Sequence, residues 1–131
     1  MNSTLIVFFG AGVGGVLRHG VNLAALRWPL AGFAVGFPWG TMAINIVGSA
    51  LMGLVAGWFA LRSGTTPNQD LRLFLATGIL GGFTTFSAFS LDAMLLWQRG
   101  EAGAAAFYVL GSVAISLAGL AGGLALMRVA S

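Results

Sequence analysis

Apolar residues fill four long segments of this chain, at residues 4–26, 39–61, 71–97 and 102–127, and most polar residues lie between them. A helix needs about 20 mostly apolar residues to cross a bilayer, so each segment is long enough to form a span. The pattern predicts an all-α membrane protein in which residues 1–131 form a single domain of four transmembrane helices. With four crossings, both ends of the chain lie on the same side of the membrane.

The composition supports this assignment. Hydrophobic residues make up 58% of the chain and charged residues only 7%, whereas soluble domains have roughly 25% charged residues. A chain of 131 residues has too small a core to bury so much apolar surface. The first three residues lack the basic side chain of a secretory signal, so we expect the first apolar segment to remain as a span.

The charged and reactive residues exclude several classes of protein. The net charge is +3, and all six basic residues are scattered arginines, which argues against a nucleic-acid surface. Cysteine is absent, so disulfides and thiolate metal sites are excluded. One histidine, His19, and three acidic residues offer no catalytic set. We therefore expect no enzyme and assign His19 no role.

The arginines leave the orientation in the membrane open. An excess of basic residues in short loops normally marks the cytoplasmic side. The side that holds the termini has Arg62, Arg72 and Arg128. The opposite side has Arg27 and Arg99, together with Arg18 if its side chain reaches that interface. Either a partner or a weak bias sets one orientation, or copies insert both ways and pair antiparallel. The second interpretation is favoured, because four short spans enclose little on their own.

Small and polar residues recur at helical spacing within the spans. Three glycine pairs allow close packing of helix backbones: Gly10/Gly14, Gly53/Gly57 and Gly119/Gly123. Polar side chains share one face of the second span, at Thr41, Asn45 and Ser49, and one face of the fourth, at Tyr108, Ser112 and Ser116. A single such hydroxyl is commonly structural, but two aligned stripes with an amide and a phenol favour a polar pathway.

Two charged residues lie within or near the ends of the spans. An arginine at the depth of Arg18 is costly in hydrocarbon unless a partner or water relieves it. Asp92 is expected at a similar depth on the same side. We consider an Arg18–Asp92 ion pair and an Arg18 side chain open to an aqueous vestibule about equally.

The third span contains an interruption. Gly81 and Gly82 weaken its helix near the middle, and Thr84, Thr85 and Ser87 offer the backbone competing hydrogen bonds. In a bilayer, a broken helix is tolerated only where it is buried in protein or lines a cavity, and such breaks often coordinate ions. Phe86 and Phe89 follow on roughly one face, and their electropositive ring edges suit a small anion. These features predict a homodimeric ion pathway at a broken helix.

Three motifs carry a resemblance to a known family. They are Gly14-Gly15-x-x-Arg18, Gly40-Thr-x-x-x-Asn45-x-x-Gly48 and Gly78-x-x-Gly-Gly-x-Thr-Thr-Phe-Ser-x-Phe89. Together they resemble the signatures of the small bacterial fluoride channels, the Fluc or CrcB family. The resemblance implies passive fluoride export across the inner membrane by an antiparallel, dual-topology homodimer with two pores and a buried structural sodium ion.

The resemblance also implies roles for individual residues. The fluoride pathway would comprise the paired phenylalanines Phe86 and Phe89, the amide of Asn45, the hydroxyls of Thr85 and Ser87, and a track of Tyr108, Ser112 and Ser116. The backbone carbonyls of Gly81 and Thr84 from both subunits would hold the sodium ion. One departure is Ala88, which stands where the family commonly has threonine and removes one hydroxyl from the pathway.

Two other functions compete with the channel. A small dual-topology drug/proton antiporter shares the size and the charge balance, but it needs a carboxylate embedded in the membrane. The first span has none, and Asp92 is expected near an interface. A membrane scaffold without transport activity would explain the glycine pairs but leave the Asn45 stripe and the helix break without a purpose.

Overall fold

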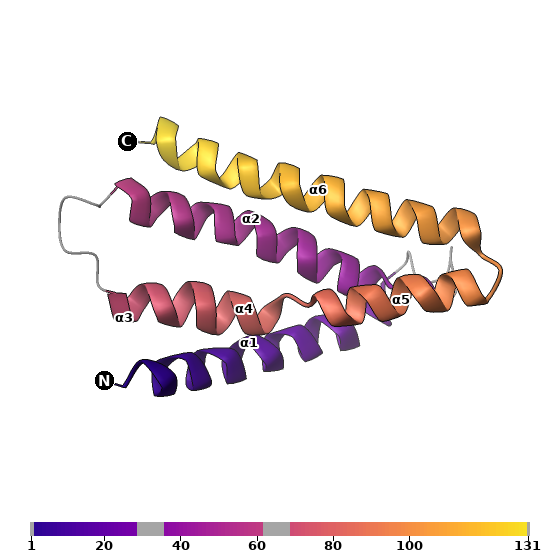
Figure 1. The fold of residues 1–131 in the computed structure, drawn as a ribbon, viewed down its shortest axis with the longest axis horizontal. Coiled ribbons are helices and arrows are strands. Elements are labelled where there is room, and N and C mark those ends of the chain that lie inside the picture. Colours follow the sequence, from indigo (N-terminus) through magenta and orange to yellow (C-terminus); the bar gives the residue numbers. More distant parts are fainter. Residues whose placement is uncertain (1, 29–35, 62–68, 131) are drawn as a thin grey trace.

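The computed structural model describes residues 2–28, 36–61 and 69–130, and within these ranges it contains helices and short connections but no strand (Figure 1). Three spans are continuous helices: α1 (Ser3–Ala25), α2 (Trp39–Leu61) and α6 (Ala102–Val129). The third span consists of consecutive pieces: α3 (Gln69–Arg72), the π-helix η2 (Leu73–Leu80), α4 (Gly81–Phe83) and α5 (Phe86–Gln98).

The described residues confirm the four predicted spans. Four helical stretches are long and apolar enough to cross a membrane, and their limits lie close to those predicted: Ser3–Ala25, Trp39–Leu61, Gln69–Gln98 and Ala102–Val129. Large apolar side chains such as Phe8, Val16 and Leu110 are exposed on the outside, where hydrocarbon is a better solvent than water. The N and C labels of Figure 1 mark the same end of the bundle, as the number of spans predicts.

Glycines bring the helices together in two pairs, α1 with the first half of the third span and α2 with α6. A Cβ atom on Gly14 would collide with the carbonyl oxygen of Ile79, and one on Gly53 would collide with that of Leu120. Gly10, Gly57 and Gly123 lie in similarly close contacts, whereas a Cβ atom on Gly119 would lie 3.4 Å from the Cβ of Ala50, an ordinary van der Waals distance. The sequence-based interpretation of these pairs as packing positions is confirmed.

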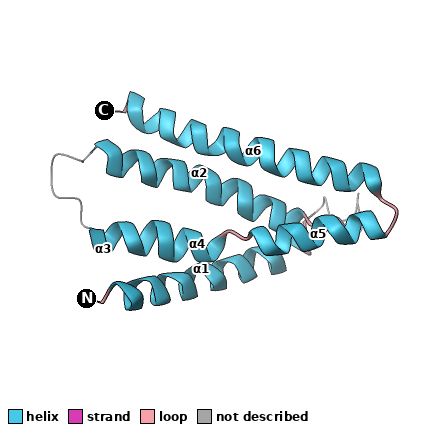
Figure 2. Cartoon of the chain, viewed as in Figure 1, coloured by secondary structure: helices cyan, strands magenta, loops and turns pink. Residues whose placement is uncertain are grey.

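The break in the third span is confirmed, but it lies after the two glycines rather than at them. Gly81 is α-helical (φ −64°, ψ −37°) and begins α4, whereas Thr84 (φ −76°, ψ 158°) and Thr85 (φ −153°, ψ 119°) are extended. A Cβ atom on Gly82 would lie 2.5 Å from the carbonyl oxygen of Ala11, so this glycine serves packing against α1. The break is drawn in pink between α4 and α5 in Figure 2.

The break lets the third span change its neighbour. Before it, η2 and α4 pack against α1; after it, α5 packs against α6. The buried cluster on this second side is formed by Met42, Phe89, Leu96, Ala105 and Tyr108. The first half of the span is thus fixed by glycine contacts and the second half by side-chain packing.

We predict that Gly14→Ala destabilises the fold. The added methyl group meets backbone rather than a flexible side chain, and overpacking of this kind typically costs about 1–3 kcal/mol. Gly12→Ala is the matched control, because nothing lies within 4 Å of its Cβ position. Thermal unfolding in detergent should show a lower midpoint for Gly14→Ala and an unchanged or higher one for Gly12→Ala. Equal midpoints for both variants would contradict the α1 contact.

Candidate ion pathway

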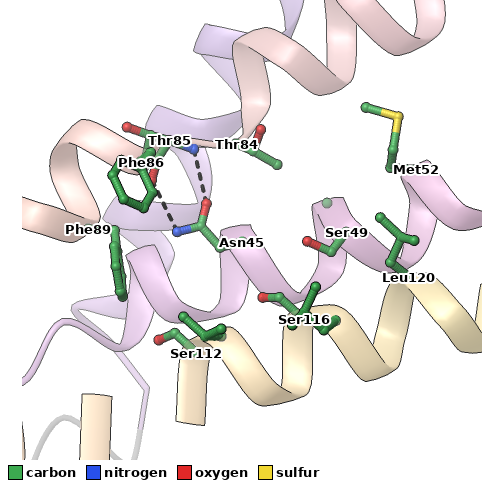
Figure 3. A pocket seen from close by; sticks show the side chains of 13 residues that line it. Asn45, Ser49, Met52, Thr84, Thr85, Phe86, Phe89, Ser112, Ser116 and Leu120 are labelled. Atoms are coloured by element: carbon green, nitrogen blue, oxygen red, sulfur yellow. Dashed lines mark hydrogen bonds between the residues drawn. The ribbon is translucent and has the colours of Figure 1, made fainter. Parts of the chain in front are cut away.

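The side-chain amide of Asn45 holds the extended backbone at the break. Its Nδ2 donates to the Thr85 carbonyl oxygen (3.1 Å), and its Oδ1 accepts from the Thr85 N–H (3.0 Å), as the dashed lines of Figure 3 mark. One amide therefore supplies both partners that a neighbouring β-strand would supply. Because a buried backbone group without a partner costs about 1–3 kcal/mol, this pair explains how the helix can break inside a span.

The two threonine hydroxyls complete the helix ends on either side of the break. Thr84 Oγ1 donates to the Leu80 carbonyl oxygen (3.0 Å), at the end of α4. Thr85 Oγ1 accepts from the Ala88 N–H (3.2 Å), which makes Thr85 the N-cap of α5. Thr85 Oγ1 also lies 3.4 Å from Ser87 Oγ.

The same contacts free two backbone carbonyls. In a continuous helix, the Gly81 carbonyl would accept from the Thr85 N–H and the Thr84 carbonyl from the Ala88 N–H. Both N–H groups are bonded elsewhere, to Asn45 Oδ1 and Thr85 Oγ1 respectively. Gly81 and Thr84 are the residues predicted to hold sodium, and freed carbonyls at a helix break are oxygen ligands that suit this ion. The donor set therefore fits the predicted metal.

An open groove of about 330 Å³ lies beside the break, between α2, α5 and α6 (Figure 3). Polar side chains occupy the end nearest the break, and apolar side chains continue it along α2 and α6. The residues that line it are Asn45, Gly48, Ser49, Met52, Thr84, Thr85, Phe86, Phe89, Ser112, Val113, Ser116, Leu117 and Leu120. None of these described residues carries a charge.

Two hydroxyls in the groove lack hydrogen-bond partners. Within the described part of the chain, Ser112 Oγ and Ser116 Oγ are buried and bond to nothing. A buried polar group without a partner is unfavourable, so this wall is suited to a guest that accepts hydrogen bonds. The N-terminal end of α5 lies at the same groove, and the N-terminus of a helix carries a partial positive charge. The site is therefore suited to a small anion.

Two phenylalanine rings flank the polar end of the groove. The centroids of Phe86 and Phe89 lie 5.6 Å apart with the rings tilted by 41°. Phe89 is 8% exposed and Phe86 is 78% exposed. Their edges are the electropositive part of the ring, which attracts an anion without a formal charge.

The groove brings together six of the eight predicted pathway residues: Asn45, Thr85, Phe86, Phe89, Ser112 and Ser116. Ser87 and Tyr108 do not line it. Tyr108 is fully buried behind Phe89, with ring centroids 5.2 Å apart, and its hydroxyl donates to Asp92 Oδ2 (3.3 Å). In the described residues, Asp92 is thus bonded to Tyr108, and no ion pair joins it to Arg18.

Sequence reasoning did not assign several lining residues to the site. Gly48 stands in the second motif, and a Cβ atom there would collide with the Thr84 methyl group, so this glycine makes room for the break. Met52 and Leu120 extend the polar faces of α2 and α6 by one turn. The helical period alone would have found them, by continuing each stripe past its last polar residue.

Comparison with known proteins places the chain in a family. Residues 5–124 match the profile of the family described as CrcB-like protein, Camphor Resistance (CrcB). The chain belongs to this family. Its CrcB-like relatives include a protein of Methylobacterium nodulans named fluoride-specific ion channel FluC, 62% identical over 98% of both chains. A protein of the same name from Rhodopseudomonas palustris is 55% identical over 95% of both chains. Another from Granulibacter bethesdensis is 55% identical over 98% of this chain and 96% of the relative.

For this CrcB-like chain, we predict that Asn45→Ala and Asn45→Asp both lower the thermal midpoint in detergent. Alanine leaves the Thr85 N–H and carbonyl unpaired, a loss of roughly 2 kcal/mol or more. Aspartate keeps an acceptor for the N–H but places a carboxylate oxygen against the carbonyl. Ser49→Ala, one turn along the same face, should have little effect. A midpoint for Asn45→Ala that matches the Ser49→Ala control would refute the role of the amide.

Proposed function

We propose that this chain forms a fluoride-selective channel through which cytoplasmic fluoride leaves a bacterial cell passively across the inner membrane. The observation that carries the proposal is the pair of buried, unpartnered hydroxyls of Ser112 and Ser116 in a groove beside the α5 N-terminus. The similar FluC proteins bear the name of a fluoride-specific channel, which gives the anion its identity. The function is transport rather than catalysis.

The groove lets an anion pass without holding it firmly. Hydroxyls and ring edges replace part of the water around fluoride, and no cationic side chain in the groove binds it tightly enough to block conduction. Phe86 and Phe89 lie next to Asn45 and Thr85, so the rings and the donors act on the ion at the same depth. The membrane potential, worth about 2.3 kcal/mol per charge per 100 mV, drives the anion outward without a coupling ion.

A second copy of the chain completes the site in this proposal. Phe86 projects from the surface with 78% of its area exposed, and Gly81, whose carbonyl is freed, is exposed as well. The near balance of arginines between the two ends supports antiparallel pairing in both orientations. The inverted dimer has two pores, one along each groove.

In this proposal, the residues at the break would hold a sodium ion between the two copies. The carbonyls of Gly81 and Thr84 from both copies hold it, because their helical donors are engaged by Asn45 and Thr85. When bound, the ion supplies a fixed positive charge that joins the two copies and is not transported. Arg18, which forms no pair with Asp92 in the described residues, is proposed to face an aqueous vestibule and attract anions there.

The competing antiporter finds no support in the groove. Exchange of a proton for a cationic drug requires a carboxylate in the pathway, and the groove has none among its lining residues. Asp92 is bonded to Tyr108 outside it.

We predict fast fluoride efflux and much slower chloride efflux from liposomes that contain the purified protein. Potassium-loaded vesicles with valinomycin keep the charge balanced, and ion-selective electrodes record each anion. Equal rates for both anions, or no fluoride efflux, would refute the proposed function.

We predict that Ser112→Ala lowers the fluoride efflux rate about 3- to 10-fold, which is the effect of one lost hydrogen bond. The control Thr77→Ala changes an exposed residue outside the groove and should leave the fluoride efflux rate unchanged.

We predict that a single cysteine at Gln69 reacts from both faces of the cell membrane. The chain has no cysteine of its own, and Gln69 is exposed at the start of the third span. Under dual topology, an impermeant maleimide labels about half of the Gln69→Cys protein in intact cells, and permeabilisation exposes the rest. Ala102→Cys, at the other end of the bundle, should also be labelled in about half of the protein in intact cells. Complete labelling at one position and none at the other would rule out dual topology.

A further inference from the structure

Aromatic rings continue from the groove toward the end of the bundle at which α2 and α6 begin. Phe86 contacts Phe89, and Phe89 contacts the ring of Tyr108 at 5.2 Å between centroids. On its other side, Tyr108 meets Phe37 edge to face, at 5.6 Å and an interplanar angle of 90°. Phe37 is therefore joined to the pore phenylalanines through one buried ring, although it lies before α2 and outside the groove.

The position of Phe37 is fixed by contacts on both sides. The ring of Trp39 lies 4.4 Å from that of Phe37, and the Trp39 N–H donates to the Phe37 carbonyl (2.9 Å). The preceding Gly36 has a left-handed backbone (φ 82°), which favours glycine, and its carbonyl accepts from Arg99 Nη2 (3.1 Å). Arg99 in turn pairs with Glu101 (Nε–Oε1 3.1 Å). Through Arg99, the turn between α5 and α6 thus fixes the position of the segment that carries Phe37.

Tyr108 is held by contacts on every side, so its ring cannot shift to fill space left by a smaller side chain at Phe37. Its side chain is fully buried, its hydroxyl bonds to Asp92, and its ring lies between those of Phe89 and Phe37. Edge-to-face and tilted ring pairs fix relative orientation as well as distance. Among the described residues, Phe37 and Phe89 are the ring neighbours of Tyr108, so loss of the Phe37 ring removes one support of Tyr108 and loosens the tilt of Phe89 toward the groove.

We propose that Phe37 is a positioning residue for permeation: it fixes Tyr108 and thereby the orientation of the Phe89 ring in the pathway, and the Arg99–Gly36 hydrogen bond holds it in place. The inference rests on the proposed fluoride conduction, because that is the activity it modulates. It assigns a role to a segment outside the groove and the three sequence motifs.

Phe37→Leu tests the inference in the full-length protein by the fluoride efflux assay. We expect a rate about tenfold lower, the size of a lost ring pair, with the assembly state by size exclusion unchanged. Phe37→Tyr, which keeps the ring, should restore the rate to within about twofold of the unmodified protein. Phe107→Leu is the matched control, because Phe107 also contacts Phe37 (5.9 Å) but is exposed, and no ring contact joins it to Tyr108. Its rate should be unchanged.

A second arm separates positioning from a general loss of structure. If Phe37 acts through Tyr108, the effects of Phe37→Leu and Tyr108→Leu on the rate do not add in the double variant. Additive effects would overturn the inference. Arg99→Ala, an exposed change remote from the core, should also lower the rate, whereas Glu101→Gln, which keeps the Arg99–Gly36 bond, should not.

The inference and the proposed function fail in different ways. If the unmodified protein conducts fluoride but Phe37→Leu conducts equally well, only the inference falls. If the unmodified protein shows no fluoride efflux, the proposed function falls first.

Discussion

The structure depends on one reciprocal pair of hydrogen bonds, between the Asn45 amide and the backbone of Thr85. A transmembrane helix cannot break in hydrocarbon unless the freed N–H and carbonyl groups find partners. An amide carries a donor N–H and an acceptor oxygen side by side, which matches a backbone N–H and carbonyl of one residue, so Asn45 on α2 satisfies both groups. The contact fixes the extended backbone from which α5 starts, and side-chain packing against α6 then holds α5 and the Phe89 ring.

The break creates partial charges of opposite sign on its two sides. Toward α4, the carbonyls of Gly81 and Thr84 lose their helical donors and present negative partial charge, which suits a cation. Toward α5, the Thr85 cap begins a new helix whose N-terminal end presents positive partial charge, which suits an anion. A few residues therefore present partial charges of both signs, without any charged side chain among the residues that line the groove. This arrangement avoids the large cost of a bare charge at the middle of a bilayer.

The sequence predicted the spans, the glycine contacts and most of the groove, because each depends on composition or helical period. It placed the weakness at Gly81 and Gly82, whereas Gly82 is needed for packing against α1 and the residues with extended backbone are Thr84 and Thr85. The π-helix over Leu73–Leu80 could not be predicted, because a nearly uniform apolar stretch has no pattern that separates π from α. The Tyr108–Asp92 bond and the contacts of Phe37 are tertiary, and no spacing along the chain encodes them.

The distribution of burial explains why the polar features point to a partner rather than to the lipid. Exposure of leucine or valine to hydrocarbon costs nothing, but the freed carbonyl of the exposed Gly81 is unfavourable there, and the buried hydroxyls of Ser112 and Ser116 have no partner within the described residues. Phe86 projects beside them, 78% exposed, from the first turn of α5. All of these features gather at or beside one interrupted helix, while the remaining outer surface is mainly apolar. A face of this kind is stable in a membrane only when protein, water or ions cover it, which is the part that the second copy plays in the proposed dimer.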